Sequence, residues 1–356
     1  GKVEGAYQTE KGYLARLDAM YLSDANPLMA YGNFNNINRQ VSNRSFGGMS
    51  MGSTSPFGKQ QFGSVGYKHQ WLGKDGNATL KNFFSVNAQG QHTDGWGTSS
   101  ESRETFMPGA DRTFSLTENR NYEHKSKPEV SFYGQFLPAS VTWIMVRGGW
   151  SYEKSRNTER QRNAVYDGDP YAFSRHPLDQ AFATENLADA DGAPTSRSLY
   201  RTTTWKEAMN ANASLGVRRL LPKKGQLNVG ASVSFTDRTS DVLAERDLRF
   251  RYDPEANELR YETDHRPEQS LKTSADARYQ VWLGKKLLLK MGYEFIHSRD
   301  NDRQQHSVTD AAAAPNADEE GETTDPNSYR RRQTSDRHDA TLAATLNLGS
   351  RGARRR

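Results

Sequence analysis

The sequence has no cysteine and no long apolar run. Its 356 residues are 34% hydrophobic, and the mean hydropathy is −0.92. Without cysteine, disulfide scaffolds and thiolate metal sites are excluded. The richest apolar segment, 141–146, is soon followed by Arg147 and two glycines, so no stretch approaches the roughly 18 apolar residues of a membrane-spanning helix. The composition therefore disfavours both a large conventional core and helical membrane spans.

Aromatic and charged residues are plentiful. Aromatics make up 10% of the chain, which argues against disorder. The 48 basic and 43 acidic residues are interspersed along the chain, which predicts a mixed, wet surface and no nucleic-acid partner. A polar chain rich in aromatics fits a β-barrel, because only every second residue of a barrel strand faces lipid.

Apolar residues alternate with polar ones in paired runs. Every second residue of 227–235 is apolar, and the residues between them are small and polar. The run 209–217 repeats this pattern, and 221–225 joins the two as a tight hairpin. A second hairpin pairs 275–283 with 287–295, two earlier ones turn at 71–77 and 138–140, and a run at 342–348 begins another pair. The pattern predicts an all-β, antiparallel fold of about twelve strands.

Polar segments separate these hairpins at roughly 94–124, 157–199, 239–267 and 301–333. Short turns on one side and long loops on the other are typical of a transmembrane β-barrel with periplasmic turns and extracellular loops. A soluble antiparallel sheet with one wet face shows the same alternation, and it is the alternative interpretation.

Two sets of side chains follow from the barrel hypothesis. Aromatics near both ends of the strands predict two membrane-interface belts, with Tyr67, Trp71 and Trp282 toward the short turns and Trp150, Tyr152, Tyr293 and Phe295 toward the long loops. The alternation also predicts charged residues that face the lumen, where they would contact a plug or line a wet path: Arg16, Asp18, Lys81, Arg147, Arg218, Asp276, Arg278, Lys290 and Glu294.

Two motifs are candidate ligand sites. Asn33, Asn35, Asn36 and Asn38 would offer donors and acceptors to a ligand at an extracellular rim, although Asn and Gly also build turns, and the turn interpretation is favoured. The acidic run 318–325 lacks the spacing of a calcium loop, which favours a solvated loop.

Nothing in the sequence predicts catalysis. The eight histidines form no His-x-x-x-His or HExxH pair, and no nucleophile elbow or phosphate-binding loop is present. His297 and Ser298 adjoin, yet they would point to opposite faces of a strand. We therefore expect no enzymatic activity, no metal site and no cofactor.

The first part of the chain carries a family resemblance. Tyr31-Gly32-Asn33-Phe34-Asn35-Asn36-Ile37-Asn38 presents a Gly-x-x-Asn-Asn-x-Asn element after an early strand, and Phe46-Gly47-Gly48 follows it. With the hairpin from Gly63-x-x-Gly66-Tyr67 to Trp71-x-Gly73, these residues resemble the start of the barrel in TonB-dependent outer-membrane receptors of the Bacteroidetes type. The resemblance is clearest over residues 2–155.

This resemblance implies a barrel of about 22 strands with a plug in its lumen. Residues 1–349 would then be a barrel segment and 350–356 a basic tail at a truncation point. The implied function is the wall of a nutrient receptor in the outer membrane of a Gram-negative bacterium, with lipid, the plug, the TonB complex and an unidentified siderophore, glycan or peptide as partners. A surface binding or adhesion barrel without a plug is the alternative.

Overall fold

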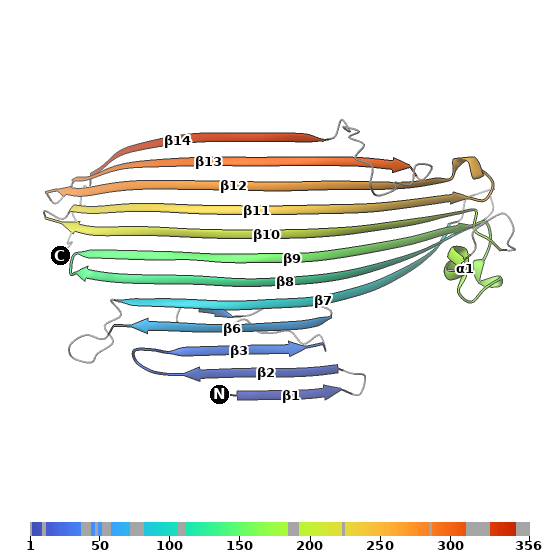
Figure 1. Ribbon diagram of the computed structural model, residues 1–356, viewed down its shortest axis with the longest axis horizontal. Helices are drawn as coiled ribbons and strands as arrows, with labels where there is room; N and C mark the ends of the chain where they lie inside the picture. Colours follow the sequence, from blue (N-terminus) through green and yellow to red (C-terminus); the bar gives the residue numbers. More distant parts are fainter. Residues whose placement is uncertain are drawn as a thin grey trace, which may run out of the picture.

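The computed structural model describes residues 2–8, 12–36, 44–46, 49–51, 58–71, 82–105, 112–183, 192–222, 225–284, 287–310 and 328–346. Twelve strands form one antiparallel sheet in which each strand pairs with its neighbours in chain order (Figure 1). The prediction of an all-β antiparallel fold with about twelve strands is confirmed. Among the described residues, no helix is both long enough and apolar enough to cross a membrane.

The sheet has a group of short strands followed along the chain by a group of longer ones. The first four in the sheet are β1 (Lys2–Gln8), β2 (Gly12–Tyr21), β3 (Leu28–Asn35) and β6 (Lys59–Gln70). The next eight are β7 (Phe83–Thr105), β8 (Thr113–Ala139), β9 (Thr142–Tyr166), β10 (Ser196–Leu221), β11 (Gly225–Phe250), β12 (Glu258–Leu283), β13 (Leu287–Asp310) and β14 (Tyr329–Leu346). The strands β4 (Arg44–Phe46) and β5 (Met49–Met51) form a separate pair.

Tight hairpins close one end of the sheet. β10 leads into β11 between Leu221 and Gly225, and β12 leads into β13 between Leu283 and Leu287, as the sequence predicts. Gly284 adopts a φ of +66°, which a residue with a Cβ rarely adopts. The opposite end, on the right in Figure 1, holds the short helices η1 (Pro170–Ala172), α1 (Pro177–Ala183) and η3 (Pro254–Ala256).

The polar segments that the sequence assigned to long loops are partly strand. β9 runs unbroken to Tyr166 and β10 begins at Ser196, so both ends of the segment 157–199 are strand and residues 167–195 connect the two strands. β11 and β12 likewise fill most of 239–267. The predicted bounds of the loops are wrong because they relied on alternation, which stops before the strands end. A paired strand with water on both faces keeps its ladder of hydrogen bonds without alternating in polarity.

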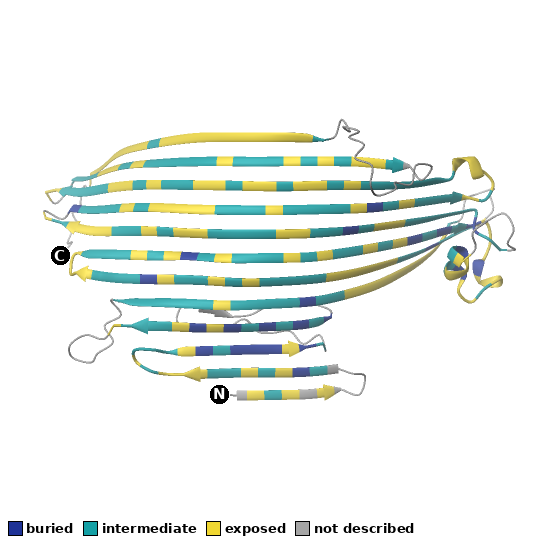
Figure 2. Cartoon of the chain, in the orientation of Figure 1, coloured by how far each residue is buried: buried dark blue, intermediate teal, exposed yellow. Residues whose placement is uncertain are grey.

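Buried side chains are few in this single-layered sheet, and they gather in two places (Figure 2). Met29, Tyr31 and Phe62 form one cluster on β3 and β6. The other lies beside α1, where Leu116, Ala164 and Tyr166 pack against Ala181. Most of the sheet has no apolar core on either side among the described residues.

Candidate functional site

The register gives the sheet two chemically different faces. Val229 pairs with Val217 on β10 and with Ala277 on β12, so the apolar positions of neighbouring strands share one face. We call it the band face, and the opposite one the polar face. On β9 to β13 the apolar band consists of Ile144, Val146, Trp150, Tyr152, Met209, Ala211, Ala213, Leu215, Val217, Leu227, Val229, Ala231, Val233, Phe235, Leu271, Ala275, Ala277, Tyr279, Val281, Leu283, Leu287, Leu289, Met291, Tyr293 and Phe295.

The band has the height of a membrane interior. From Leu287 to Phe295 it covers about 26 Å of strand, or about 20 Å at the tilt of roughly 40° that barrel strands adopt, close to the roughly 25 Å of an outer-membrane barrel. Its side chains are exposed or half-buried, and Leu215 is 47% exposed and Met291 51%. A continuous exposed apolar surface of this kind marks a contact with lipid or another apolar partner.

The band stops at charged residues. On the band face, the next side chain after Tyr152 is Lys154, and the next after Met209 is Glu207; these two form an ion pair at 2.6 Å. One step further, the Arg156 guanidinium lies 5.5 Å from the Trp205 ring centre. Charged groups of this kind are expensive in lipid, so the strands beyond this edge suit water on both faces.

The polar face carries the charged residues that the sequence assigned to a lumen. Register places all of them that are described on this face: Arg16, Asp18, Arg147, Arg218, Asp276, Arg278, Lys290 and Glu294. Lys81 lies outside the described residues. The Arg16 and Asp18 side chains pair at 3.1 Å, and the Arg147 Nε donates to Ser214 Oγ at 2.9 Å. A role in plug contact stays a prediction.

A hollow of about 470 Å³ lies on the polar face over β12, β13 and β14. Arg278 and Lys290 contribute positive charge to its lining, and Glu294 and Asp339 contribute negative charge. The hollow therefore carries both signs of charge in its lining.

Most of the predicted interface aromatics lie on the band face. Trp150, Tyr152, Tyr293 and Phe295 stand at its charged edge. Near the tight-hairpin end, the Trp71 ring centre lies 5.5 Å from that of Phe136, and the Tyr67 hydroxyl donates to Asn26 Oδ1 at 2.9 Å.

The structure contradicts the prediction that Trp282 belongs to an interface belt. It pairs with Leu288 on the polar face, between band-face Val281 and Leu283, and so it cannot belong to a lipid-side belt. Proximity to a turn was used to assign it, but in a strand the face depends on whether the position is odd or even.

The structure also contradicts the turn and ligand-site predictions for the asparagine element. Gly32 to Asn35 belong to β3 and pair with β6, so they form no turn. Asn33 is 3% exposed and Asn35 is 0% exposed, which does not fit ligand contacts at an open rim. Asn36 Oδ1 accepts a hydrogen bond from the Tyr13 backbone N–H at 2.6 Å, while Asn38 and the acidic run 318–325 lie outside the described residues.

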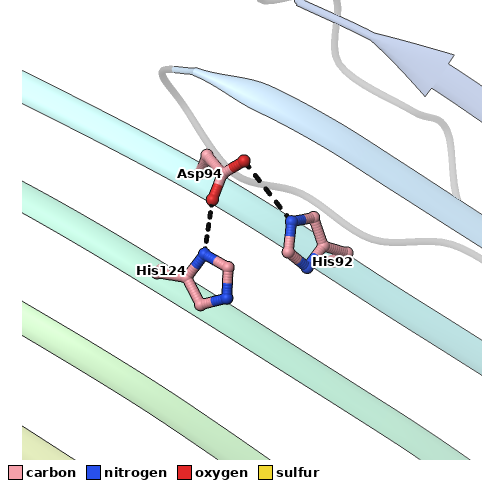
Figure 3. Close-up of side chains that lie close together, drawn as sticks. All are labelled: His92, Asp94 and His124. Carbon is pink, nitrogen blue, oxygen red and sulfur yellow. Dashed lines mark hydrogen bonds and ion pairs between the residues drawn. The ribbon is translucent and has the colours of Figure 1, made fainter.

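The structure brings together three side chains that sequence reasoning missed (Figure 3). His92 and Asp94 lie two residues apart on β7, and His124 is the register partner of Asp94 on β8. Asp94 Oδ1 lies 2.6 Å from His124 Nδ1, and Asp94 Oδ2 lies 3.4 Å from His92 Nε2. All three side chains lie on the band face. On β7 the apolar part of that face consists of Phe84, Val86, Ala88 and Gly90, and His92 and Asp94 are the next two residues on the same face.

Part of this cluster could be predicted from the sequence, namely that His92 and Asp94 lie on the same face of a strand. Residues two apart in a strand share a face, which His92 and Asp94 satisfy. The missing information was the pairing of β7 with β8, because the segment 94–124 was assigned to a loop.

A second polar cluster holds α1 against the strands. Arg162 Nε donates to Glu118 Oε2 at 2.8 Å, and Arg162 Nη2 donates to Asp179 Oδ1 at 2.8 Å. The hydrogen bond from Arg162 holds the pKa of Asp179 below its usual range, and burial raises the pKa of Tyr166 to about 12. These contacts fix a short helix at the end of the sheet away from the tight hairpins.

Comparisons with known proteins add little. No family model matches the sequence, and no curated relative is found. Among solved structures, the outer membrane protease OmpT from Escherichia coli is similar over 92% of this chain and 91% of its own, at 9% identity and a TM-score of 0.21. A likeness that weak carries no argument about fold or activity.

Proposed function

We propose that this chain forms part of the wall of a β-barrel in the outer membrane of a Gram-negative bacterium, in a receptor that imports a nutrient with energy supplied through TonB. The apolar band carries this proposal. It is exposed, about as tall as the hydrocarbon layer, and bounded by ion pairs such as Lys154 with Glu207. A soluble sheet would have to hide such a surface in a core or an interface.

The strands beyond the band support an extracellular rim. β9 continues for 14 residues after Tyr152, from Glu153 to Tyr166, and its band face there includes Arg156, Arg160 and Arg162. A charged extension of this length belongs in water, and α1 rests at its end. The tight hairpins at the other end suit the periplasmic side.

The transport part of the proposal rests on the resemblance of residues 2–155 to TonB-dependent receptors and on the charged polar face. In such a receptor, Arg147, Arg278 and Glu294 would meet a plug or the passing nutrient. The nutrient class stays open among siderophores, glycans and peptides.

A plugless surface binding or adhesion barrel would present the same band. The gene separates the two proposals: a plug domain with a TonB-box segment encoded in the same protein supports transport, and a complete gene without one contradicts it. In cells, the transport proposal expects nutrient uptake that stops when the TonB complex is removed, whereas binding by an adhesin would continue.

The membrane assignment has its own test. Purified chain is expected to aggregate in plain buffer and to show a β-rich circular dichroism spectrum in detergent micelles. A folded monomer in buffer without detergent would contradict the barrel assignment and, with it, the transport proposal.

A further inference from the structure

We propose that His92, Asp94 and His124 form a binding site for a borderline divalent cation, best suited to Zn²⁺, on the band face of β7 and β8. The site is independent of the transport proposal, because it requires only the pairing of these two strands. It lies just beyond the apolar part of the band, where both the protein and its surroundings are polar.

The ligand positions follow from strand geometry. Two residues two apart on one strand and a register partner on the next strand bring three side chains to one point of a face. Their ligand atoms all lie within 4.8 Å of one another. In a tetrahedral zinc site with bonds of about 2.0–2.1 Å, ligand atoms stand about 3.3 Å apart. The present separations of 2.6 and 3.4 Å run to the two different carboxylate oxygens of Asp94, and the widest separation is at most 4.8 Å, so a side-chain movement of about 1.5 Å would bring the three ligand atoms to tetrahedral spacing.

The histidine rings are already oriented. His92 Nδ1 lies 2.8 Å from Ser126 Oγ, which turns Nε2 toward Asp94. Metal-binding histidines usually hold such a partner on their second nitrogen, because it fixes the tautomer and the ring direction. The His124 ring stands at 78° to that of His92, with ring centres 4.8 Å apart, so both imidazoles converge on the same space. Coordination through Nδ1 of His124 would leave its proton on Nε2.

Ligand chemistry selects the ion. Two imidazoles and one carboxylate favour zinc, copper, nickel or cobalt over calcium and magnesium, which prefer sets made of oxygen. The side chains of His92, Asp94 and His124 are 29%, 21% and 43% exposed, so a fourth position remains open to water or another ligand. Three protein ligands with one open position is the arrangement of a reactive zinc site rather than a closed structural one.

The chain offers a matched control. His297 and Asp336 form the same kind of cross-strand pair on the band face, with Nδ1 and Oδ1 also 2.6 Å apart. Among the described residues, however, that pair is not part of a group of three metal-ligating side chains. It tests whether a single surface His–Asp pair is sufficient to bind the ion.

The experiment uses the whole chain, folded in detergent micelles and titrated with Co²⁺, whose visible absorption reports tetrahedral coordination. We expect one Co²⁺ per chain, displaced by Zn²⁺ and not by Mg²⁺. His92→Gln and His124→Gln are expected to weaken binding more than the 10- to 100-fold that loss of an outer partner costs, and Ser126→Ala to weaken it by about that 10- to 100-fold. His297→Gln should bind as the parent chain does.

Glutamine keeps the size and polarity of the site, and circular dichroism in the same micelles verifies that each variant is folded. Absence of the cobalt spectrum in the folded parent chain would overturn the proposal. So would binding that persists in both His92→Gln and His124→Gln, or binding that is lost equally in His297→Gln.

Discussion

An arginine at the centre of the apolar band is expected to destabilise the folded sheet in a lipid bilayer. Ala213 is the test position. It lies on the band face of β10, exposed, and it pairs with Gly148 and Val233. Charged Glu207 and Arg219 stand six residues away on either side, about 20 Å along the strand. An arginine side chain is much shorter than that, so its charge cannot reach either edge.

The magnitude follows from this depth. An arginine on the lipid face at the bilayer midplane costs about 2–4 kcal/mol, which lowers the folding equilibrium constant roughly 30- to 900-fold. Asn212→Arg is the matched control, because Asn212 is the preceding residue on the same strand, also exposed, and faces the opposite side. On that face the arginine meets water, and the expected cost is near zero.

A third variant tests the edge of the band. Thr239 pairs with Glu207 on the band face, beyond Phe235 and Asp237. Thr239→Arg is expected to cost at most about 1 kcal/mol, the value near an interface. Reversible urea unfolding in phospholipid vesicles measures all three. If Asn212→Arg costs as much as Ala213→Arg, the assignment of the two faces is wrong.

Two further predictions concern packing. Gly148→Ala is expected to destabilise the sheet by about 1–3 kcal/mol, because its Cβ would meet Phe132 Cζ at 2.5 Å and a backbone oxygen at 2.6 Å, whereas Gly90→Ala meets nothing within 4 Å and should cost nothing in the same unfolding assay. Arg162→Gln is expected to loosen α1, seen as faster proteolysis after Tyr166, and to return the pKa of Asp179 to its ordinary range, seen by NMR titration; an unchanged pKa would contradict the contact. In the parent chain, Asp179 is charged in the folded and the unfolded state at any pH above its unfolded pKa, near 3.9. Its contact with Arg162 therefore stabilises α1 fully in that range, and this stabilisation is lost as pH falls through the lowered folded pKa.

Alternation was enough to predict the band and its hairpins. In runs such as 227–235 and 287–295, alternation shows which face of the sheet each residue belongs to. The tight turn that joins each run to its partner strand then allows only one register. Prediction failed where alternation stops. Beyond Tyr152 both faces of β9 are polar, so nothing in the residues distinguishes a long strand from a loop, and the true length depends on pairing with β8 and β10.

The missed site has the same cause. His92 and His124 are 32 residues apart, and only the β7–β8 register brings them to one carboxylate. The prediction of Asn35 as a turn or rim residue was wrong for a different reason. The sequence gives no sign that the fold will bury this polar residue completely.

The absence of cysteine makes the most direct test possible, because any single cysteine introduced is unique. Spin labels at successive positions from 227 to 245 of β11, in vesicles, are expected to alternate between oxygen-accessible at odd positions and water-accessible at even ones up to Phe235, and to be water-accessible at every position from Asp237 onward. Accessibility without alternation over 227–235, or lipid exposure at the even positions, would contradict the assignment of the band face to lipid.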